Sequence, residues 1–474
     1  MSLAFRNTLG GELEPFRPRE AGRVGMYSCG PTVYAPAHVG NFRSFIFADL
    51  VRRYLSWRGY AVTWVMNITD VDDKIIRDAA KEGITIGELT DRYTQAFLDD
   101  LARLRISLPD VLPRATQHIP EMVALIETLI ERGHAYRTED GSVFFRIASW
   151  PTYGRLAKLE PDAQRVGERV EADEYSKDDV RDFALWKGAK PGEPSWDTAI
   201  GPGRPGWHIE CSAMSMRYLG PSFDLHTGGV DLVFPHHEDE IAQSEAASGV
   251  ALATHWTHVS FLRRGADKMS KSLGNFVTIR QALADHPADA VRLYLLQTHY
   301  RSPLEFAEEG IGEAQTSIAR MYETLQRADA SDAPATDCPE AETCRTELRQ
   351  ALADDLNTPR AVAALHDAVR AVNRLIDAGK PAEARGVARA LRESAGLLGI
   401  LQRDPAEALA AERAARASAA GLSDAQIEGL LEERRAARKS RDFKRADEIR
   451  KQLADAGIDL KDNPDGTTTW AARR

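Results

Sequence analysis

The sequence predicts an α/β fold in which a Rossmann-like, doubly wound parallel sheet carries an inserted α+β subdomain and is followed by α-helical domains. Three observations support this prediction. A strand–helix–strand pattern opens the chain, a glycine- and proline-rich stretch interrupts the sheet pattern near residue 200, and helical periodicity dominates after Ala290. A length of 474 residues exceeds what one hydrophobic core supports and suggests about three domains.

The opening pattern consists of three elements. The stretch "VGMYSC", residues 24–29, is typical of a strand. Apolar residues three or four apart between Phe42 and Trp57 then predict a helix, which Gly59 ends. The stretch "AVTWVMNI", residues 61–68, is a continuous β-branched run of the kind that parallel sheets bury. Together these elements predict a βαβ unit.

The middle of the chain departs from the strand–helix–strand pattern of its beginning. Here "MVALIETLIERG" predicts a helix, "GSVFFRI" a strand and "KGAKPGEPSWDTAIGPGRPGW" a long loop. We interpret residues 121–205 as an insertion that separates two halves of the sheet domain, 1–120 and 206–262. Further units are expected at 263–328, 346–404 and 422–474, with polar or alanine-rich linkers near 329–345 and 405–422.

Composition and charge narrow the class of protein. The chain is 43% hydrophobic and 28% charged, as in globular proteins, and its apolar runs are too short for a membrane span. The first residues lack a signal-peptide core, so we expect a cytoplasmic protein with reduced cysteines. The two cysteines in the polar linker, Cys338 and Cys344, are given no role.

A net charge of −10 argues against a protein that coats itself in nucleic acid, but it allows a local basic patch. Residues 432–451 contain nine basic and five acidic side chains. This stretch is consistent with a nucleic-acid contact, or with the solvated face of a charged helix.

Two short motifs suggest phosphate chemistry. The first, "HVGN" at residues 38–41, lies where the first strand leads into the first helix, and a helix N-terminus there attracts anions. Taken alone it is more typical of an ordinary turn. The second, "KMSKS" at residues 268–272, places two lysines on a polar loop, where they could neutralise charge that develops on a phosphate.

A third stretch, "FPHHEDE" at residues 234–240, is compatible with a metal site, a catalytic base cluster or the polar first turn of a helix. Helical spacing would place His236 with Glu240, His237 with Glu240, or His236 with Asp239 on a shared face. Spacing alone leaves these alternatives open.

The two phosphate motifs, in this order, resemble the signatures of the class I aminoacyl-tRNA synthetases. Longer blocks resemble the cysteinyl-tRNA synthetase family: "YSCGPTVYAPAHVGN", "NITDVDDKI", "GRPGWHIECSAMS", "TGGVDLVFPHHEDEIAQSEA", "KMSKSLGNFVTI" and "VRLYLLQTHYRSPL". The tail "RRAARKSRDFKRADEIRKQLADAGIDLKDNPDGTTTW" is also similar to that family, so the resemblance covers nearly the whole chain.

The resemblance implies one Zn²⁺ ion per chain. Its implied ligands, all of types that zinc accepts, are Cys29, Cys211, His236 and Glu240. A soft metal could select a substrate thiol over the hydroxyl of serine, which a pocket cannot reject by size. Because four protein ligands usually close a zinc site, the thiol must add as a fifth ligand or displace Glu240.

The resemblance also implies an ATP site with Mg²⁺ as its counter-ion. The implied contacts are His38, Gly40, Asn41, Asp231, Lys268 and Lys271. Of these, His38 and the two lysines are the expected catalytic residues, because they can stabilise charge on the phosphates. Histidine is common in this superfamily at the position of Asn41, which cannot carry a positive charge. For Asp231 the alternative to a ribose contact is a turn or capping role.

Three residues match positions that line the cysteine pocket of this family: Gly30, Thr69 and Trp207. The function implied is activation of L-cysteine with ATP to cysteinyl-adenylate and pyrophosphate, followed by transfer to the 3′-terminal ribose of tRNA(Cys). The helical units would bind tRNA: 263–328 would hold the KMSKS loop and contact the stem, 346–404 would form a bundle, and 422–474 would recognise the anticodon. A monomer without membrane contact is expected.

Two alternatives remain. A ligase that joins cysteine to an amino sugar would share the zinc and nucleotide motifs but resemble only the front of the chain. A zinc- and RNA-binding protein without catalytic activity would keep the scaffold, although the intact "KMSKS" and "HVGN" motifs argue against it.

Overall fold

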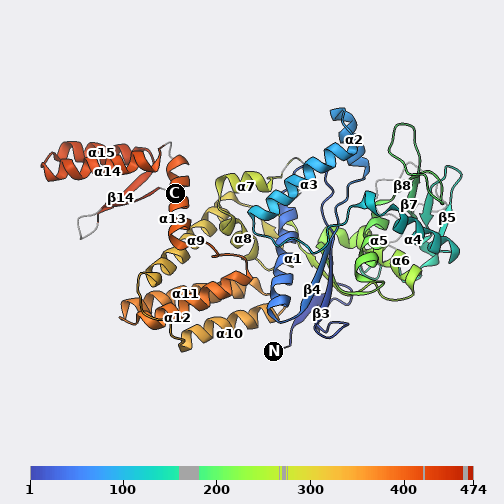
Figure 1. The fold of residues 1–474 in the computed structure, drawn as a ribbon, viewed down its shortest axis with the longest axis horizontal. Coiled ribbons are helices and arrows are strands. Elements are labelled where there is room, and N and C mark those ends of the chain that lie inside the picture. Colours follow the sequence, from blue (N-terminus) through green and yellow to red (C-terminus); the bar gives the residue numbers. More distant parts are fainter. Residues whose placement is uncertain are drawn as a thin grey trace.

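The computed structural model describes residues 2–159, 181–265, 267–269, 274, 276–419, 422–462 and 468–472. At its centre lie four parallel strands in the order β10-β9-β3-β4 (Figure 1). Their bounds are Arg23–Ser28 for β3, Ala61–Met66 for β4, Phe223–Gly229 for β9 and Ala253–Val259 for β10. The predicted parallel sheet and its βαβ opening are therefore confirmed.

Helices cover both sides of this sheet (Figure 1). Helix α1, Val39–Trp57, connects β3 to β4 and buries Phe42, Phe45, Phe47 and Tyr54 in the largest core cluster. Helices α5, Trp207–Leu219, and α6, Glu238–Ser248, lie on the other side. Two helices follow β4: α2, Asp73–Glu82, and α3, Ile86–Arg103. Near the N-terminus, β1 (Ala4–Asn7) pairs with β2 (Glu12–Pro15).

A separate antiparallel sheet occupies the stretch interpreted as an insertion. Its strands have the order β5-β6-β7-β8 and lie beside helix α4, Ile119–Glu131 (Figure 1). The strands are Ala135–Arg137, Val143–Phe145, Phe183–Gly188 and Gly203–Pro205. Its side chains pack with those of α5 and α6 in one core cluster, so this sheet is attached directly to these two helices.

After the sheet domain come three short strands and then mostly helix. The strands are β11 (Leu262–Arg264), β12 (Asp267–Lys268) and β13 (Leu304–Glu305). The helices are α7 (Ile279–Asp285), α8 (Ala288–Leu296), α9 (Glu308–Asp329), α10 (Pro339–Ala353), α11 (Thr358–Asp377), α12 (Pro381–Leu397) and α13 (Pro405–Ala419). No helix of the described ranges is long and apolar enough to cross a membrane.

Both linker interpretations were partly wrong. Helix α10 begins inside 329–345, and most of 405–422 is helix α13. The polar and alanine-rich composition of these stretches suggested loops. Alanine is nevertheless the strongest helix former, and the small buried faces of these helices pack against neighbouring helices. Cys344 is accordingly a buried residue of α10 rather than a linker residue.

The C-terminal unit lies at the opposite end of the molecule from the inserted sheet (Figure 1). It has its own small core and consists of α14 (Asp424–Lys439), α15 (Phe443–Asp455), β14 (Ile458–Asp462) and β15 (Thr468–Ala472). Within its basic stretch, Arg434 is buried and donates two hydrogen bonds to Asp462. That arginine stabilises the fold, whereas Arg441 and Lys444 are exposed.

A buried ion pair joins the parallel-sheet domain to the helices that follow. Arg292 of α8 and Asp49 of α1 are both 0% exposed, and their side chains are 2.7 Å apart. The guanidinium also donates to the carbonyl oxygens of Leu104 and Leu398. Burial opposes charge on Asp49, but Arg292 and Arg53 hold the pKa of this carboxyl below its usual value.

Replacing Asp49 with alanine should therefore destabilise the protein strongly. Asp49→Ala leaves the buried Arg292 without its counter-charge, a change that typically costs about 3–5 kcal/mol. The urea midpoint of unfolding measures the loss. Glu347→Ala, which removes the exposed pair with Arg360, is the matched control and should cost about 0.2–1 kcal/mol. Equal losses in the two variants would contradict a structural role for the buried pair.

Candidate active site

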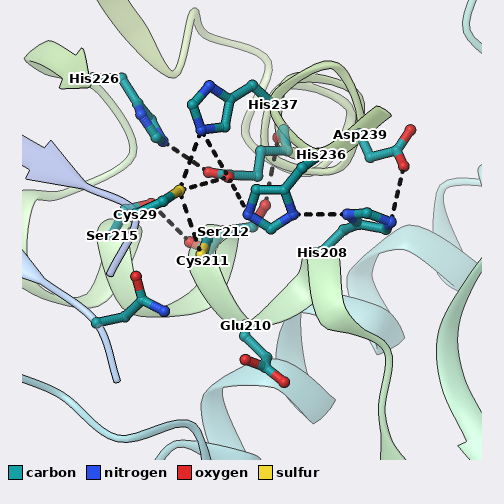
Figure 2. A network of polar contacts seen from close by, with 12 residues as sticks. Cys29, His208, Glu210, Cys211, Ser212, Ser215, His226, His236, His237 and Asp239 are labelled. Carbon is teal, nitrogen blue, oxygen red and sulfur yellow. Dashed lines mark hydrogen bonds and ion pairs between the residues drawn. The ribbon is translucent and has the colours of Figure 1, made fainter. Parts of the chain in front are cut away.

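Four of the predicted site residues meet at the carboxyl edge of the parallel sheet (Figure 2). Cys29 directly follows β3, Cys211 lies on α5, and His236 lies in the turn before α6. Glu240 lies in the first turn of α6. One potential ligand atom from each lies within 4.8 Å of the others. Residues 182 positions apart in sequence thus form one cluster because β3 and α5 pack together.

The distances within this cluster are short. The two sulfur atoms are 3.8 Å apart, and Cys29 Sγ lies 3.5 Å from Glu240 Oε1. His236 Nε2 lies 3.0 Å from the same carboxylate oxygen. Cys211, His236 and Glu240 are at most 1% exposed, whereas Cys29 is partly exposed. The ligand atoms of the cluster are therefore shielded from water.

The electrostatics favour a cation at this position. Burial opposes charge on Glu240, yet His226 and His236 hold the pKa of this carboxyl well below its usual range. Burial likewise disfavours charge on His236, but Cys211 and Glu240 raise its pKa to about 10. Buried anionic groups thus surround a site where positive charge is stable. The donor set of two sulfurs, one imidazole and one carboxylate fits zinc.

A second set of ligand atoms overlaps the first. It also uses Cys29 and Glu240 but replaces the other two members with His226 and His237. His226 Nε2 is 2.9 Å from Glu240 Oε2, and His237 Nε2 is 3.2 Å from Cys29 Sγ. Sequence reasoning missed His226. The signal was present, since a histidine lies within the strand-like stretch "FDLHTGG".

The two remaining carboxylates of "FPHHEDE" have structural partners. Glu238 accepts hydrogen bonds from the backbone N–H groups of Gly154, Leu156 and Ala157, and so binds the inserted subdomain to α6. Asp239 accepts a 2.6 Å hydrogen bond from the hydroxyl of Tyr153. Burial raises the pKa of both carboxyls. Acidic side chains are favourable in the first turn of a helix such as α6.

The residues predicted to line the substrate pocket lie nearby. Gly30 donates a 2.8 Å hydrogen bond to the side chain of Asn67, and a Cβ atom at Gly30 would lie 1.7 Å from the carbonyl oxygen of Asn67. Only glycine fits this close approach of two chain segments. Trp207, 38% exposed, stacks on His236 with ring centroids 4.2 Å apart. Thr69 donates to Glu210, a buried carboxylate that sequence reasoning missed.

The first signature forms the N-terminus of α1. His38 is its N-cap: Nδ1 accepts from the backbone N–H of Asn41, and Asn41 Oδ1 accepts from the N–H of His38, both at 3.2 Å. Asn41 therefore orients His38. A Cβ atom at Gly40 would lie 2.9 Å from His38 Nδ1. Glycine thus leaves room for the His38 ring against the helix N-terminus.

The second signature is anchored beside the first. Thr278 forms an isolated β-bridge with His38, and Val39 donates its N–H to the carbonyl oxygen of Val277. At the other end, the backbone of Lys268 lies in β12, paired with Arg263 of β11. The predicted Lys271 lies outside the described residues. Asp231 is exposed and directly follows β9, at the same edge of the sheet.

Comparisons with known proteins agree with this arrangement. Residues 15–316 match the family model of the class I tRNA synthetase (C) catalytic domain, 347–402 match a DALR domain, and 421–470 match the cysteinyl-tRNA ligase anticodon-binding domain. The chain is 48% identical over 472 residues to a cysteine–tRNA ligase of Halorhodospira halophila, with 100% of both chains covered. It belongs to the cysteine–tRNA ligase family.

Further relatives and solved structures extend the comparison. A cysteine–tRNA ligase of Trichlorobacter lovleyi is 46% identical over 490 residues, with 100% of both chains covered. The Mycobacterium tuberculosis methionyl-tRNA synthetase bound to methionyl-adenylate superposes with a TM-score of 0.60, 16% identity, and coverage of 85% of this chain and 95% of that one. A putative Campylobacter jejuni arginyl-tRNA synthetase gives 0.54 at 13% identity, covering 81% and 94%. These two structures share the fold.

Replacing one clustered cysteine should weaken metal binding. Cys211→Ser should bind zinc at least about tenfold more weakly, because removing even a group that supports a ligand typically costs 10–100-fold. Competition with a chromogenic chelator measures the affinity. Cys344→Ser, at a buried cysteine of α10, is the matched control and should bind zinc normally. Unchanged affinity in Cys211→Ser would refute the assignment of this ligand.

Proposed function

We propose that this chain activates L-cysteine with ATP and transfers it to tRNA(Cys), using zinc at the cluster of Cys29, Cys211, His236 and Glu240 to select the thiol. The observation that supports the proposal best is the position of this cluster. A zinc-type donor set lies at the same edge of the sheet as a helix N-terminus suited to phosphate. An amino acid held by its sulfur would thus lie beside bound ATP.

A thiol-selective metal explains how such an enzyme could reject serine. Zinc bound by these four residues would stabilise the substrate sulfur as a thiolate, a gain that a serine hydroxyl cannot match because it is a much weaker acid. The substrate would approach beside Cys29, the one residue of the four that is partly exposed. Trp207, stacked on His236, and Gly30 would border the entering substrate.

Activation requires little covalent help from the protein. The cysteine carboxylate attacks the α-phosphorus of ATP, the bond to the bridging oxygen breaks, and pyrophosphate leaves. Phosphoryl-type transfer of this kind depends mainly on positioning and on stabilising charge. His38, fixed by its hydrogen bonds with Asn41, and the α1 N-terminus would contact the phosphates. Lys268, Lys271 and Mg²⁺ would neutralise the departing pyrophosphate.

Transfer to tRNA would use the helical part of the chain. The terminal ribose hydroxyl attacks the carbonyl carbon of the adenylate and AMP leaves. The match of residues 421–470 to an anticodon-binding domain, far from the catalytic site, supports tRNA as the acceptor (Figure 1). It argues against the amino-sugar ligase, which would resemble only the front of the chain. Asp231 remains our proposal for the ribose contact of ATP.

Cysteine-dependent exchange between ATP and pyrophosphate tests the first step. The zinc-loaded protein should catalyse this exchange with cysteine at a kcat/KM about 10⁴-fold above that with serine. Discrimination of about this size is typical of a site that binds one particular polar group of its substrate and rejects an analogue lacking that group. No exchange with cysteine would refute the proposed activity. Comparable exchange with both amino acids would refute selection by the metal.

A separate pair of substitutions tests whether tRNA is the acceptor of cysteine. Exposed Arg441 and Lys444 are expected to bind tRNA phosphates, so replacing both with alanine should lower kcat/KM for tRNA charging. The slope of log affinity against log salt should fall by about 0.7–0.9 for each phosphate that the variant no longer neutralises. Cysteine-dependent exchange in the same variant is the control and should be unchanged. A loss of exchange together with charging would contradict a role confined to tRNA.

A further inference from the structure

Arg43 is a buried cation in the second turn of α1 whose partners lie in two distant segments of the chain. It is 3% exposed. Its Nη1 donates to the carbonyl oxygens of Ser260 at 2.9 Å and of Phe261 at 3.1 Å. Its Nη2 donates to those of His299 at 3.1 Å and of Ser302 at 2.7 Å. One planar guanidinium thus fixes two backbone segments relative to α1.

The guanidinium is charged in this buried position. Burial lowers the pKa of Arg43 to about 10, which is still well above neutral pH. A buried charge is costly unless polar partners compensate it, and here carbonyl oxygens are those partners. Because these oxygens are backbone atoms, the contacts of Arg43 depend on where the two segments lie and not on which side chains they carry.

Both segments lead into the small sheet that carries the first lysine of the second signature. Ser260 and Phe261 precede β11, and Ser302 lies two residues before β13. Strand β11 pairs with β13 in parallel and with β12 in antiparallel orientation, and in the second pairing Arg263 lies opposite Lys268. The backbone of Lys268 is thus held by a sheet whose two other strands begin beside the contacts of Arg43.

The far end of the second signature is held by the first turn of the same helix. Val39 donates its N–H to the carbonyl oxygen of Val277 at 3.0 Å. Gly40 lies close to β11, since a Cβ atom at this glycine would be 3.5 Å from the Cβ atom of Leu262. Helix α1, which begins within the first signature, therefore contacts the backbone on both sides of the second.

We propose that Arg43 is a positioning residue for the activation step, which sets the backbone of Lys268 against His38 so that both signatures reach the same triphosphate. It acts through the backbone and not on the substrate, because its guanidinium is buried and bonded to carbonyl oxygens. Stabilising a developing charge requires groups that are already in place. The inference rests on the proposed function and adds a residue that neither signature contains.

This role separates the two chemical steps. In activation, negative charge moves onto the departing pyrophosphate, which Lys268 would stabilise. In transfer the leaving group is AMP, and pyrophosphate has already left. A displaced second signature should therefore slow activation and leave transfer unchanged, whereas a general loosening of the fold should slow both steps.

The substitution Arg43→Lys tests this role. Lysine keeps the positive charge, but a single ammonium on a flexible stem cannot reach four acceptors in two segments as a guanidinium does. The kcat for cysteine-dependent exchange between ATP and pyrophosphate should fall about 10–100-fold, since a misplacement of about 1 Å can cost a factor of about 100. The KM for cysteine should stay unchanged, because the variant keeps the cluster of Cys29 and Cys211 intact.

Transfer is measured separately by isolating the enzyme–adenylate complex and mixing it rapidly with tRNA(Cys). The single-turnover rate of cysteine transfer in Arg43→Lys should equal that of the unchanged protein. The matched control is Arg53→Lys in the same helix. Arg53 donates to the carbonyl oxygens of Arg105 and Gly396, outside the second signature, so both steps should proceed at normal rates in this control.

A second variant weakens the same small sheet without removing a buried guanidinium. The exposed side chain of Glu305 in β13 accepts the backbone N–H of Gly265, which lies between β11 and β12. Glu305→Ala should therefore lower the kcat of exchange by a smaller factor than Arg43→Lys and leave transfer unchanged. If circular dichroism shows that Arg43→Lys does not fold, Glu305→Ala decides, and normal exchange in it would then overturn the inference.

Three results with a folded Arg43→Lys protein would also overturn the inference. They are normal exchange, an equal loss of exchange and transfer, and an equal loss of exchange in Arg53→Lys. Absence of cysteine-dependent exchange in the unchanged protein would refute the proposed function as well, whereas these three results refute only the role of Arg43.

Discussion

The buried carboxylate of Glu240 is the group around which the active site is organised. It is 0% exposed, and each of its oxygens lies 2.9–3.0 Å from a histidine nitrogen. A buried charge is costly unless it is paired, so the surrounding histidines are physically required partners of this carboxylate. Because Glu240 lies in the first turn of α6, this requirement also fixes where α6 packs against the sheet.

The proposed zinc site and the proposed phosphate site lie at the same edge of the parallel sheet. Cys29 follows β3 directly, and the chain then reaches the α1 N-cap at His38 within ten residues. The segment after the second signature pairs with this cap through Thr278. The sulfur of the substrate and the phosphates of ATP would therefore be positioned by one rigid unit, which is the condition for catalysis by positioning.

Much of this arrangement could be predicted from the sequence, and the remainder could not for physical reasons. Alternating strand and helix patterns predicted the parallel sheet, and family blocks brought together Cys29 and Cys211. Helical spacing could not separate His236 from His237, because both lie one helical turn before Glu240 and both reach its carboxylate, at 3.0 and 3.9 Å. His226 and His208 are distant in sequence and meet α6 only through tertiary packing. The alanine-rich stretch 405–422 suggested a linker, although most of it is helix α13, because composition alone does not show what a helix packs against.

The central claim is that zinc in this cluster binds the sulfur of the substrate. X-ray absorption at the zinc edge, recorded on the purified protein with and without cysteine, measures the number of sulfur ligands directly. The account predicts two sulfur neighbours in the resting protein, from Cys29 and Cys211, and three when cysteine is bound. A protein without zinc, or a sulfur count that cysteine does not change, would contradict it.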